Sequence, residues 1–311
     1  MLHDIVSYLR AERWKQWNIL FHRCSTDVLW EIFNDELDYP AIVARQYPAG
    51  APAARGRREA DALERLKHLR DELGIPTVLC RTELSDQEFL LIRSGMPGHT
   101  LADQLGLNDY QELNRQIHCV EPWLRRFQRR MGTYGSMCDA LLLSIRGCEE
   151  KMTTLSLEEK QLFAAAKDIS PMLGCLPAVA VHGDFWGGNI LSYGGGISVI
   201  DWETLHYGSM LEDAYQFLIG AVLCDSIPDE ELMWRIFVDG SRAGQIAKLV
   251  TFQMLEDWQV AEDLLYPLFL MFLVSCLHST EFRVHAGWRR FVSRYVRAGM
   301  PPPFATSGNR Y

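Results

Sequence analysis

The chain has 311 residues, of which 48% are hydrophobic and 23% are charged. This composition is typical of a globular protein and excludes a largely disordered chain. The formal net charge is -9, so the chain lacks the basic field of a nucleic-acid-binding protein, and we expect no nucleic-acid partner.

Cysteines and apolar runs indicate the compartment. The eight cysteines are scattered without the spacing of a zinc site, as is typical of reduced thiols in a cytoplasmic protein. The longest apolar run, 264–277, contains Tyr266 and Pro267 and is too short to cross a bilayer. We therefore expect a cytoplasmic protein without a membrane partner, in which this run forms a buried core helix.

The first hundred residues favour a small antiparallel sheet. Residues 17–24, 28–33 and 41–47 are rich in β-branched and aromatic side chains, and the polar turn Ser25-Thr26-Asp27 separates the first two runs. Residues 49–56 are interpreted as a loose segment. Two further strands are expected at 77–80 and 88–92, and residues 93–98 lose all periodicity and are interpreted as a hinge.

One helix follows the loose segment. Gly74 and Pro76 end this helix. Its apolar residues recur at helical spacing, at Ala62, Leu63, Leu66, Leu69 and Leu73. Glu59 lies four residues before Leu63, so it projects from the same inward face, where a carboxylate needs a partner. Beyond residue 98 the pattern is mostly helical, apart from a strand-rich segment at 178–203.

The strand-rich segment carries the chemistry. Apolar residues flank three consecutive glycines, 194–196, which predicts a β-hairpin. If the turn centres on Gly195, Asn189 and Asp201 face each other with Cα atoms about 5 Å apart. An amide and a carboxylate oxygen at that separation could hold one Mg²⁺. Asp184 lies in the preceding glycine-containing loop and could act as a base beside a metal–phosphate pair.

These residues form a pattern. His182-x-Asp184 followed by Asn189, then Ile200-Asp201-Trp202-Glu203 and a glycine and aspartate at Gly208 and Asp213, resembles the aminoglycoside phosphotransferase and choline kinase family, which is similar in fold to protein kinases. The resemblance implies that Asp184 is the catalytic base and that Asn189 and Asp201 bind Mg²⁺. It implies that Asp213 and His182 brace the catalytic loop, and simple packing in the core is the alternative for His182. Glu203 is left open between bracing the loop and contacting substrate.

The resemblance extends to the nucleotide site. Arg45 lies on the third strand, where protein kinases have a lysine that grips the α- and β-phosphates, and it could also pair with Glu59. The turn after the first strand is not glycine-rich, so the hydroxyls and backbone amides of Ser25 and Thr26 are expected to contact phosphate. Nucleotide contacts are also expected from the hinge (Arg93, Ser94, Gly95 and Met96).

These observations predict an α+β, two-lobed, protein-kinase-like fold. Residues 1–95 would form a nucleotide-binding lobe with a small antiparallel sheet and one helix, and residues 96–311 a larger, mainly helical lobe. The predicted function is an ATP- and Mg²⁺-dependent transfer of phosphate to a hydroxyl of a small molecule such as an amino alcohol, an aminoglycoside or a sugar. A pseudokinase that binds nucleotide without turnover is the alternative. A metal-dependent hydrolase built on His182, Asp184 and Asp201 is disfavoured by Asn189 and the lack of a histidine cluster.

The acceptor site is expected between the catalytic loop and the later helices. Residues 202–263 hold 12 acids against 3 bases, which indicates either a solvated surface or a wall for a cationic acceptor. Trp234, Trp258 and Tyr266 belong to or follow this stretch. They could stack on an amine or a sugar, or they could be core residues of helices.

Overall fold

The structure is a computed structural model that describes residues 18–23, 27–34, 37–84, 87–102, 110–150, 152–222, 230–278 and 286–304. Two of the expected phosphate contacts, Ser25 and Thr26, lie outside these residues. The chain divides into two compact units, the first made of residues 1–100 and 189–205 and the second of residues 101–188 and 206–311. Each unit is described by itself below.

The first unit contains a five-stranded antiparallel sheet in the order β1-β2-β3-β5-β4. The strands are β1 (Asn18–Arg23), β2 (Val28–Phe33), β3 (Ile42–Tyr47), β4 (Val78–Glu83) and β5 (Phe89–Ser94). Alternate side chains of the central strands form one buried cluster, which includes Ile32, Ala44 and Ile92. Tyr47 and Phe89 on the opposite face, towards α2, are also buried, so both faces of the central strands are covered.

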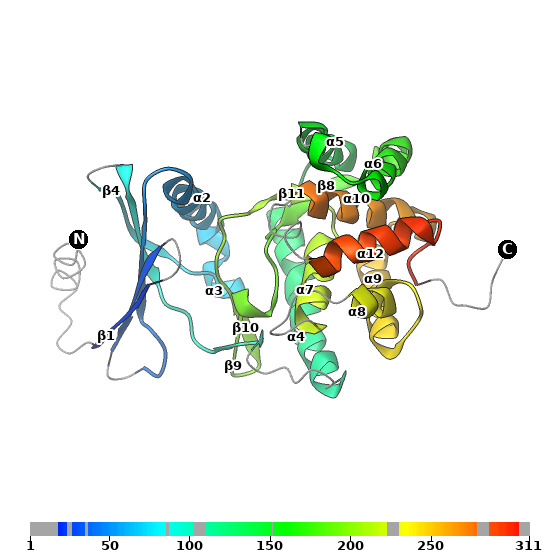
Figure 1. Cartoon of the computed structure of the whole chain (residues 1–311). Helices are drawn as coiled ribbons and strands as arrows, with labels where there is room; N and C mark the ends of the chain where they lie inside the picture. Colours follow the sequence, from blue (N-terminus) through cyan, green and yellow to red (C-terminus); the bar gives the residue numbers. More distant parts are fainter. Residues whose placement is uncertain are drawn as a thin grey trace. The chain divides into compact units, whose positions relative to one another are not determined.

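The helix of the first unit begins earlier than its apolar pattern indicated. Residues 49–56 were expected to be a loose segment, but α2 spans Ala51–Leu66 and packs against β3, β4 and β5 (Figure 1). Pro52 is tolerated because the first turn of a helix needs no N–H donor there. Gly56 is required because a Cβ at this position would lie 2.4 Å from the Tyr47 ring. The short helix α3 (Arg70–Leu73) then ends at Gly74.

A second sheet of the first unit joins distant parts of the sequence. Its strands β6 (His99–Thr100), β9 (Ile190–Tyr193) and β10 (Gly196–Val199) lie in the order β10-β9-β6. Gly194 and Gly195, with φ of 58° and 85°, form the two-residue turn between β9 and β10. The predicted hairpin register is therefore wrong by one residue: Val199 pairs with Ile190, and the N–H of Ile200 donates to the carbonyl of Asn189 at 3.0 Å.

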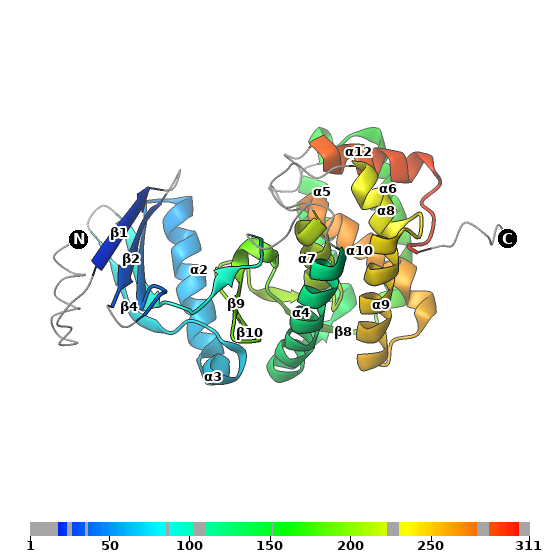
Figure 2. The same ribbon diagram turned by 90° about the horizontal axis from the view of Figure 1, so that it is seen from below.

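The second unit is mainly helical. Its three-stranded sheet has the order β11-β8-β7, with β7 (Thr133–Ser136), β8 (Pro177–Val181) and β11 (His206–Gly208). Its helices are α4 (Tyr110–Met131), α5 (Met137–Glu150), α6 (Leu157–Ile169), α7 (Glu212–Val222), α8 (Glu230–Phe237), α9 (Arg242–Asp257), α10 (Leu265–His278) and α12 (Ala286–Arg297) (Figure 2). As predicted, α10 is a core helix, since Phe269, Phe272 and Leu273 are fully buried.

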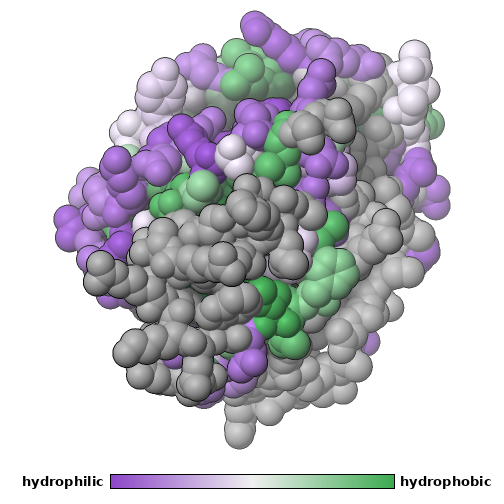
Figure 3. Space-filling model, turned by 90° about the vertical axis from the view of Figure 1, so that its left-hand side faces the viewer, coloured by the Kyte–Doolittle hydropathy of each residue, from purple (hydrophilic) through white to green (hydrophobic). Residues whose placement is uncertain are grey.

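Two surface properties complete the fold. None of the helices in the described ranges combines the length and the apolar character that crossing a membrane requires. On the outer strand β1, Leu20 and Phe21 have exposed fractions of 51% and 59%. Figure 3, which views the molecule from the side that bears β1 in Figure 1, shows hydrophobic side chains gathered among hydrophilic ones on this face.

Candidate active site

The predicted metal ligands lie at the open end of the β9–β10 hairpin in the first unit. Asn189 directly precedes β9 and is buried, and Asp201 follows β10 after one residue, with its side chain 28% exposed. Asp201 adopts φ of 63°, a left-handed conformation that aspartate tolerates better than most residues. Such backbone strain is concentrated at functional sites, because the surrounding structure must hold it in place.

The donor set of this hairpin end suits Mg²⁺. One amide oxygen and one carboxylate leave most of the coordination shell to water and phosphate, which is the arrangement that Mg²⁺ prefers. The described part of the chain contains no group of three or more His, Cys, Asp and Glu residues placed to hold a metal. The residues therefore fit a magnesium–phosphate site better than a zinc-type site, and their role as ligands stays a prediction.

Arg45 of β3 lies beside Asp201. Its Nη1 donates to Asp201 Oδ1 at 3.3 Å, and its guanidinium carbon lies 4.8 Å from the centre of the Tyr47 ring. The predicted pairing with Glu59 is longer than the ion pair with Asp201, at 4.0 Å from Nη1 to Oε2. The shortest contact of Arg45 is instead with Asp27, whose Oδ2 accepts from Arg45 Nη2 at 2.7 Å and from Nε at 3.0 Å.

Glu59 of α2 is buried, as its place in the apolar pattern indicated, with its side chain 1% exposed. The hydroxyl of Tyr47 donates to its carboxylate, and Arg93 Nε lies 3.5 Å from Oε1. Burial raises the pKa of Glu59, and the charge of Arg93 opposes that change. Arg93, expected to contact nucleotide from the hinge, thus lies where it compensates a buried carboxylate.

Arg55 of α2 joins the same group of charges. Its Nη2 lies 3.2 Å from Asp27 Oδ2, and its Nη1 lies 3.4 Å from Oε1 of Glu203. Burial, and next the charge of Asp201, raise the pKa of Glu203 to about 7. The contact with Arg55 favours a structural role for Glu203 in the first unit over direct contact with substrate.

The hinge residues are held by backbone contacts. Ser94 is the last residue of β5, and its Oγ accepts a hydrogen bond from the N–H of Thr77 at 2.9 Å. The N–H of Gly95 donates to the carbonyl of Ala41 at 2.8 Å, and a Cβ on Gly95 would lie 1.5 Å from the carbonyl oxygen of Pro40. Met96 is half-buried. The close approach at Gly95 explains why glycine occupies this position.

The loop that carries Asp184 belongs to the second unit and is fixed by α7. Asp213 accepts hydrogen bonds from the N–H of His182 at 2.7 Å and of Gly183 at 3.0 Å. Gln216, one turn later on α7, accepts from the N–H of Phe185 at 2.9 Å and donates to the carbonyl of Gly183 at 3.1 Å. The backbone on both sides of Asp184 is therefore held by one helix.

His182 is fully buried and also supports this loop. Its Nδ1 accepts a hydrogen bond from the N–H of Asp184 at 3.3 Å, and its ring packs edge-on against Phe185. The histidine thus both packs in the core, as one interpretation of the sequence had it, and braces the loop, as the resemblance implied.

Side chains alternate along this loop. Phe185 is fully buried and stacks on Trp123 with ring centres 5.6 Å apart. Asp184 is half-buried and Trp186 is 42% exposed, so the residues on either side of Phe185 are less buried than Phe185 itself. A Cβ on Gly188 or on Gly220 of α7 would lie 2.3 Å or 2.7 Å from Trp186 atoms, so glycines make room for this side chain.

Several acids of the acidic stretch are paired with basic side chains within the second unit. Glu231 lies 2.8 Å from Arg294 Nη1, and Asp257 lies 3.1 Å from Arg125 Nη1. The guanidinium carbon of Arg294 lies 4.1 Å from the centre of the Trp234 ring, and the indole N–H of Trp258 donates to Gln128. These contacts favour a paired surface over an acidic wall for a cationic acceptor.

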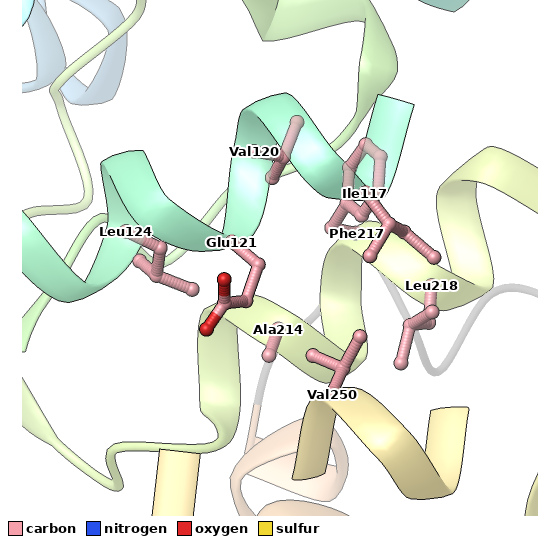
Figure 4. A pocket seen from close by; sticks show the side chains of 8 residues that line it. All are labelled: Ile117, Val120, Glu121, Leu124, Ala214, Phe217, Leu218 and Val250. Carbon is pink, nitrogen blue, oxygen red and sulfur yellow. The ribbon is translucent and has the colours of Figure 1, made fainter. Parts of the chain in front are cut away.

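A small pocket lies between α4, α7 and α9 of the second unit. Its volume is about 10 Å³, room for no more than one water molecule. Figure 4 shows the carboxylate of Glu121 among apolar side chains that include Val120, Leu124 and Val250. Arg125 Nε lies 2.5 Å from Glu121 Oε1, so the carboxylate is compensated within α4. This pocket is too small to hold an acceptor substrate.

Sequence reasoning missed three polar residues of these clusters. Asp27 was treated only as part of a turn, Arg55 lay in the supposed loose segment, and Gln216 received no role. A signal existed for Gln216, because it follows Asp213 by three residues and shares its helix face. For Asp27 the only signal was its position as an acid directly before a predicted strand, and the structure shows that this acid is buried.

Comparisons with known proteins identify the family and the fold. The model of the phosphotransferase enzyme family matches residues 34–240. No curated protein matches the chain. The solved structures similar to it include a thermostable mutant of aminoglycoside phosphotransferase APH(4)-Ia in complex with ADP and hygromycin B, with a TM-score of 0.62 and 16% identity over 95% of this chain and 99% of that chain.

Two other kinases are also similar in structure. Choline kinase from Cryptosporidium parvum Iowa II has a TM-score of 0.55 and 13% identity over 97% of this chain and 98% of that chain. The amicoumacin kinase hAmiN, in complex with AMP-PNP, Ca²⁺ and Ami, has a TM-score of 0.53 and 13% identity over 97% of each chain. At these identities the likeness concerns the fold, and it confirms the predicted α+β, protein-kinase-like class.

Proposed function

The chain belongs to the phosphotransferase enzyme family as a small-molecule kinase, and we propose that it moves the γ-phosphate of ATP to a hydroxyl of a small molecule in a Mg²⁺-dependent reaction. The observation that carries this proposal is the fixation of the Asp184 loop. Asp213 and Gln216 bind the backbone on both sides of Asp184, and Asp184 itself is half-buried. A catalytic group needs such a rigid support.

Asp184 is proposed to orient the acceptor hydroxyl and to accept its proton. As the hydroxyl oxygen bonds to the γ-phosphorus and the bond to the leaving ADP oxygen breaks, the proton passes to an Asp184 carboxylate oxygen. Asn189 follows Asp184 by five residues. A fully extended chain of that length spans about 17 Å, so covalent geometry alone sets this as the largest distance between the two Cα atoms. The proposal therefore assigns roles to residues of both units that adjoin in the sequence.

Asn189 and Asp201 are the proposed Mg²⁺ ligands, and Arg45 is the proposed phosphate contact. When bound, Mg²⁺ neutralises charge on the phosphates during transfer. The guanidinium of Arg45 lies 3.3 Å from Asp201, so it could bind an oxygen of a phosphate that also binds the metal. The hinge residues Arg93, Ser94, Gly95 and Met96 remain proposed contacts of the rest of the nucleotide.

The acceptor is proposed to be a small molecule with a hydroxyl group. The similar structures include a complex with hygromycin B and a choline kinase, which supports an aminoglycoside, an amino alcohol or a sugar-like compound. The exposed Trp186, two residues after Asp184, could pack against such a molecule beside the reacting hydroxyl. The cysteines whose state the structure describes are free, which suits a reaction in the cytoplasm.

A transfer assay tests the proposal. Purified protein, ATP and Mg²⁺ are incubated with hygromycin B, choline and a panel of sugars, and phosphorylated product is detected by mass spectrometry. Mg²⁺-dependent product that disappears in Asp184→Asn is the expected result. ATP binding without product from any acceptor would favour the pseudokinase alternative, and hydrolysis to free phosphate as the main product would contradict transfer.

A further inference from the structure

Asp27 is a buried carboxylate to which the proposed reaction gives no role. It lies directly before β2 and is 2% exposed. Leu29 pairs with Arg45 across β2 and β3, so Asp27 lies two residues from the position opposite Arg45. A buried carboxylate is costly unless charges of opposite sign and hydrogen bonds compensate it, so its partners indicate why it is there.

The first partner is one edge of the Arg45 guanidinium. Both Nε and Nη2 donate to Asp27 Oδ2, at 3.0 Å and 2.7 Å. A planar guanidinium that is held along its Nε and Nη2 edge cannot turn freely. Its remaining nitrogen, Nη1, lies 3.3 Å from Asp201 and 4.0 Å from Glu59. Asp27 thus fixes the direction in which Arg45 presents Nη1.

The second partner is Arg55 of α2. Its Nη2 lies 3.3 Å from Asp27 Oδ1 and 3.2 Å from Oδ2, and its Nη1 reaches Glu203 at 3.4 Å. Two guanidinium groups therefore compensate one buried carboxylate. Asp27 connects β2, β3 and α2 at a point that also adjoins the segment containing Asp201 and Glu203.

We propose that Asp27 is a positioning residue for the phosphates of the nucleotide. It holds one edge of Arg45 so that Nη1 faces the phosphates bound beside Asp201. In protein-kinase-like enzymes a glycine-rich loop covers the phosphates, and residues 24–27 of this chain contain no glycine. A fixed arginine supplies a phosphate contact that does not depend on a glycine-rich loop. This inference rests on the proposed function.

Nucleotide binding to Asp27→Asn tests the inference without any acceptor. Calorimetry measures the affinity of the full chain for AMP-PNP with Mg²⁺ and, separately, for adenosine, which has no phosphate. We expect the affinity for AMP-PNP to fall about tenfold, the scale of one charged hydrogen bond, while the affinity for adenosine stays within about twofold. With an active acceptor, KM for ATP should rise more than kcat falls.

The matched control is Glu83→Gln. Glu83 of β4 accepts from Nε and Nη2 of Arg57 in α2 at 2.7 Å and 2.6 Å, so it holds the same edge of an arginine of the first unit, but it is exposed. Its loss should leave both affinities unchanged. Asp27→Glu keeps the charge but shifts the fork by one methylene, so we expect partial rescue, and this variant carries the test if Asp27→Asn does not fold.

The outcomes separate the inference from the proposed function. Equal losses for AMP-PNP and adenosine would show a general structural role and overturn the inference, as would unchanged or tighter AMP-PNP binding in Asp27→Asn. A parent protein that binds no AMP-PNP with Mg²⁺ would overturn the proposed function together with the inference.

Discussion

Asp213 accepts a hydrogen bond from the backbone N–H of His182 at 2.7 Å, and thereby fixes the end of β8 to the first turn of α7. Its second oxygen accepts from the N–H of the following glycine. A carboxylate at the start of a helix is also favoured by the helix dipole. The loop that bears the proposed base is thus anchored by a residue 29 positions away in the sequence, inside one unit.

The charge of Asp213 makes stability depend on pH. Burial raises the pKa of Asp213 to about 7, although its two backbone hydrogen bonds oppose this. An unfolded aspartate titrates near pH 3.9, so between about pH 4 and pH 7 only the folded form keeps the proton. We therefore expect the free energy of unfolding to fall as pH rises through this range, by at most about 4 kcal/mol from this group.

Urea denaturation of the parent and of Asp213→Asn at pH 4.5 to 7.5 measures this contribution. The variant should show a flatter pH dependence, while Asp71→Asn, which changes an exposed carboxylate, should keep the slope of the parent. The pKa of Glu203 is also raised to about 7, so this group also lowers the free energy of unfolding as pH rises. The variant should therefore keep part of the pH dependence. An unchanged slope in Asp213→Asn would contradict the prediction.

Asp184→Asn should separate chemistry from binding. The amide keeps the size and hydrogen bonding of the side chain but is not a base. We expect kcat for an active acceptor to fall about 10²-fold or more, with Mg²⁺–ATP affinity within a few-fold of the parent. Steady-state transfer and calorimetry measure the two quantities. Parental turnover in this variant would show that Asp184 is not the base.

Asp201→Ala should abolish Mg²⁺-dependent turnover and leave the fold intact. The variant loses one of only two proposed protein ligands, and magnesium held by few protein oxygens cannot spare one. The transfer rate across a Mg²⁺ titration, with thermal unfolding as the check of the fold, measures this. Asp168→Ala, an exposed acid of α6, is the control. Retained Mg²⁺-dependent turnover would contradict the assignment of the metal site.

Arg45 should couple more strongly to Asp27 than to Glu59. The contacts are 2.7 Å and 4.0 Å, and the Tyr47 hydroxyl and Arg93 also compensate Glu59. In double-mutant cycles of alanine variants, followed by urea denaturation, we expect about 1–3 kcal/mol for Arg45–Asp27 and a smaller value for Arg45–Glu59. Equal or stronger coupling of Arg45 to Glu59 would contradict this prediction and support the Arg45–Glu59 pair that the sequence indicated.

The hairpin and loop of the strand-rich segment could largely be predicted from sequence because their determinants are local. The glycines, the apolar strands and the spacing from His182 to Asp213 all lie within a short stretch, so periodicity and turn chemistry constrain it. The hairpin register was wrong by one residue, because both Gly194 and Gly195 take positive φ. A turn centred on a single glycine and a two-residue turn have the same composition.

The buried charges of the first unit could be predicted only in part. Glu59 was identified because its inward face follows from helical spacing alone. The contact of Arg45 with Asp27 depends on β2 pairing with β3, and that of Arg55 on a helix that begins at Ala51. These contacts join residues that are 18 and 28 positions apart in the sequence. A local sequence pattern does not predict which of several acids pairs with a given arginine.

The pairing of β6 with β9 has a consequence for the order in which the protein forms. Thr100 pairs with Leu191, so the first unit needs a strand that the ribosome makes some ninety residues after the rest of its sheets. During synthesis the five-stranded sheet emerges first. The hydrogen bond from the N–H of Val199 to the carbonyl of Gly74, at the end of α3, can form only later. A fragment that stops at residue 100 would therefore lack β9 and β10, and with them the proposed metal ligands.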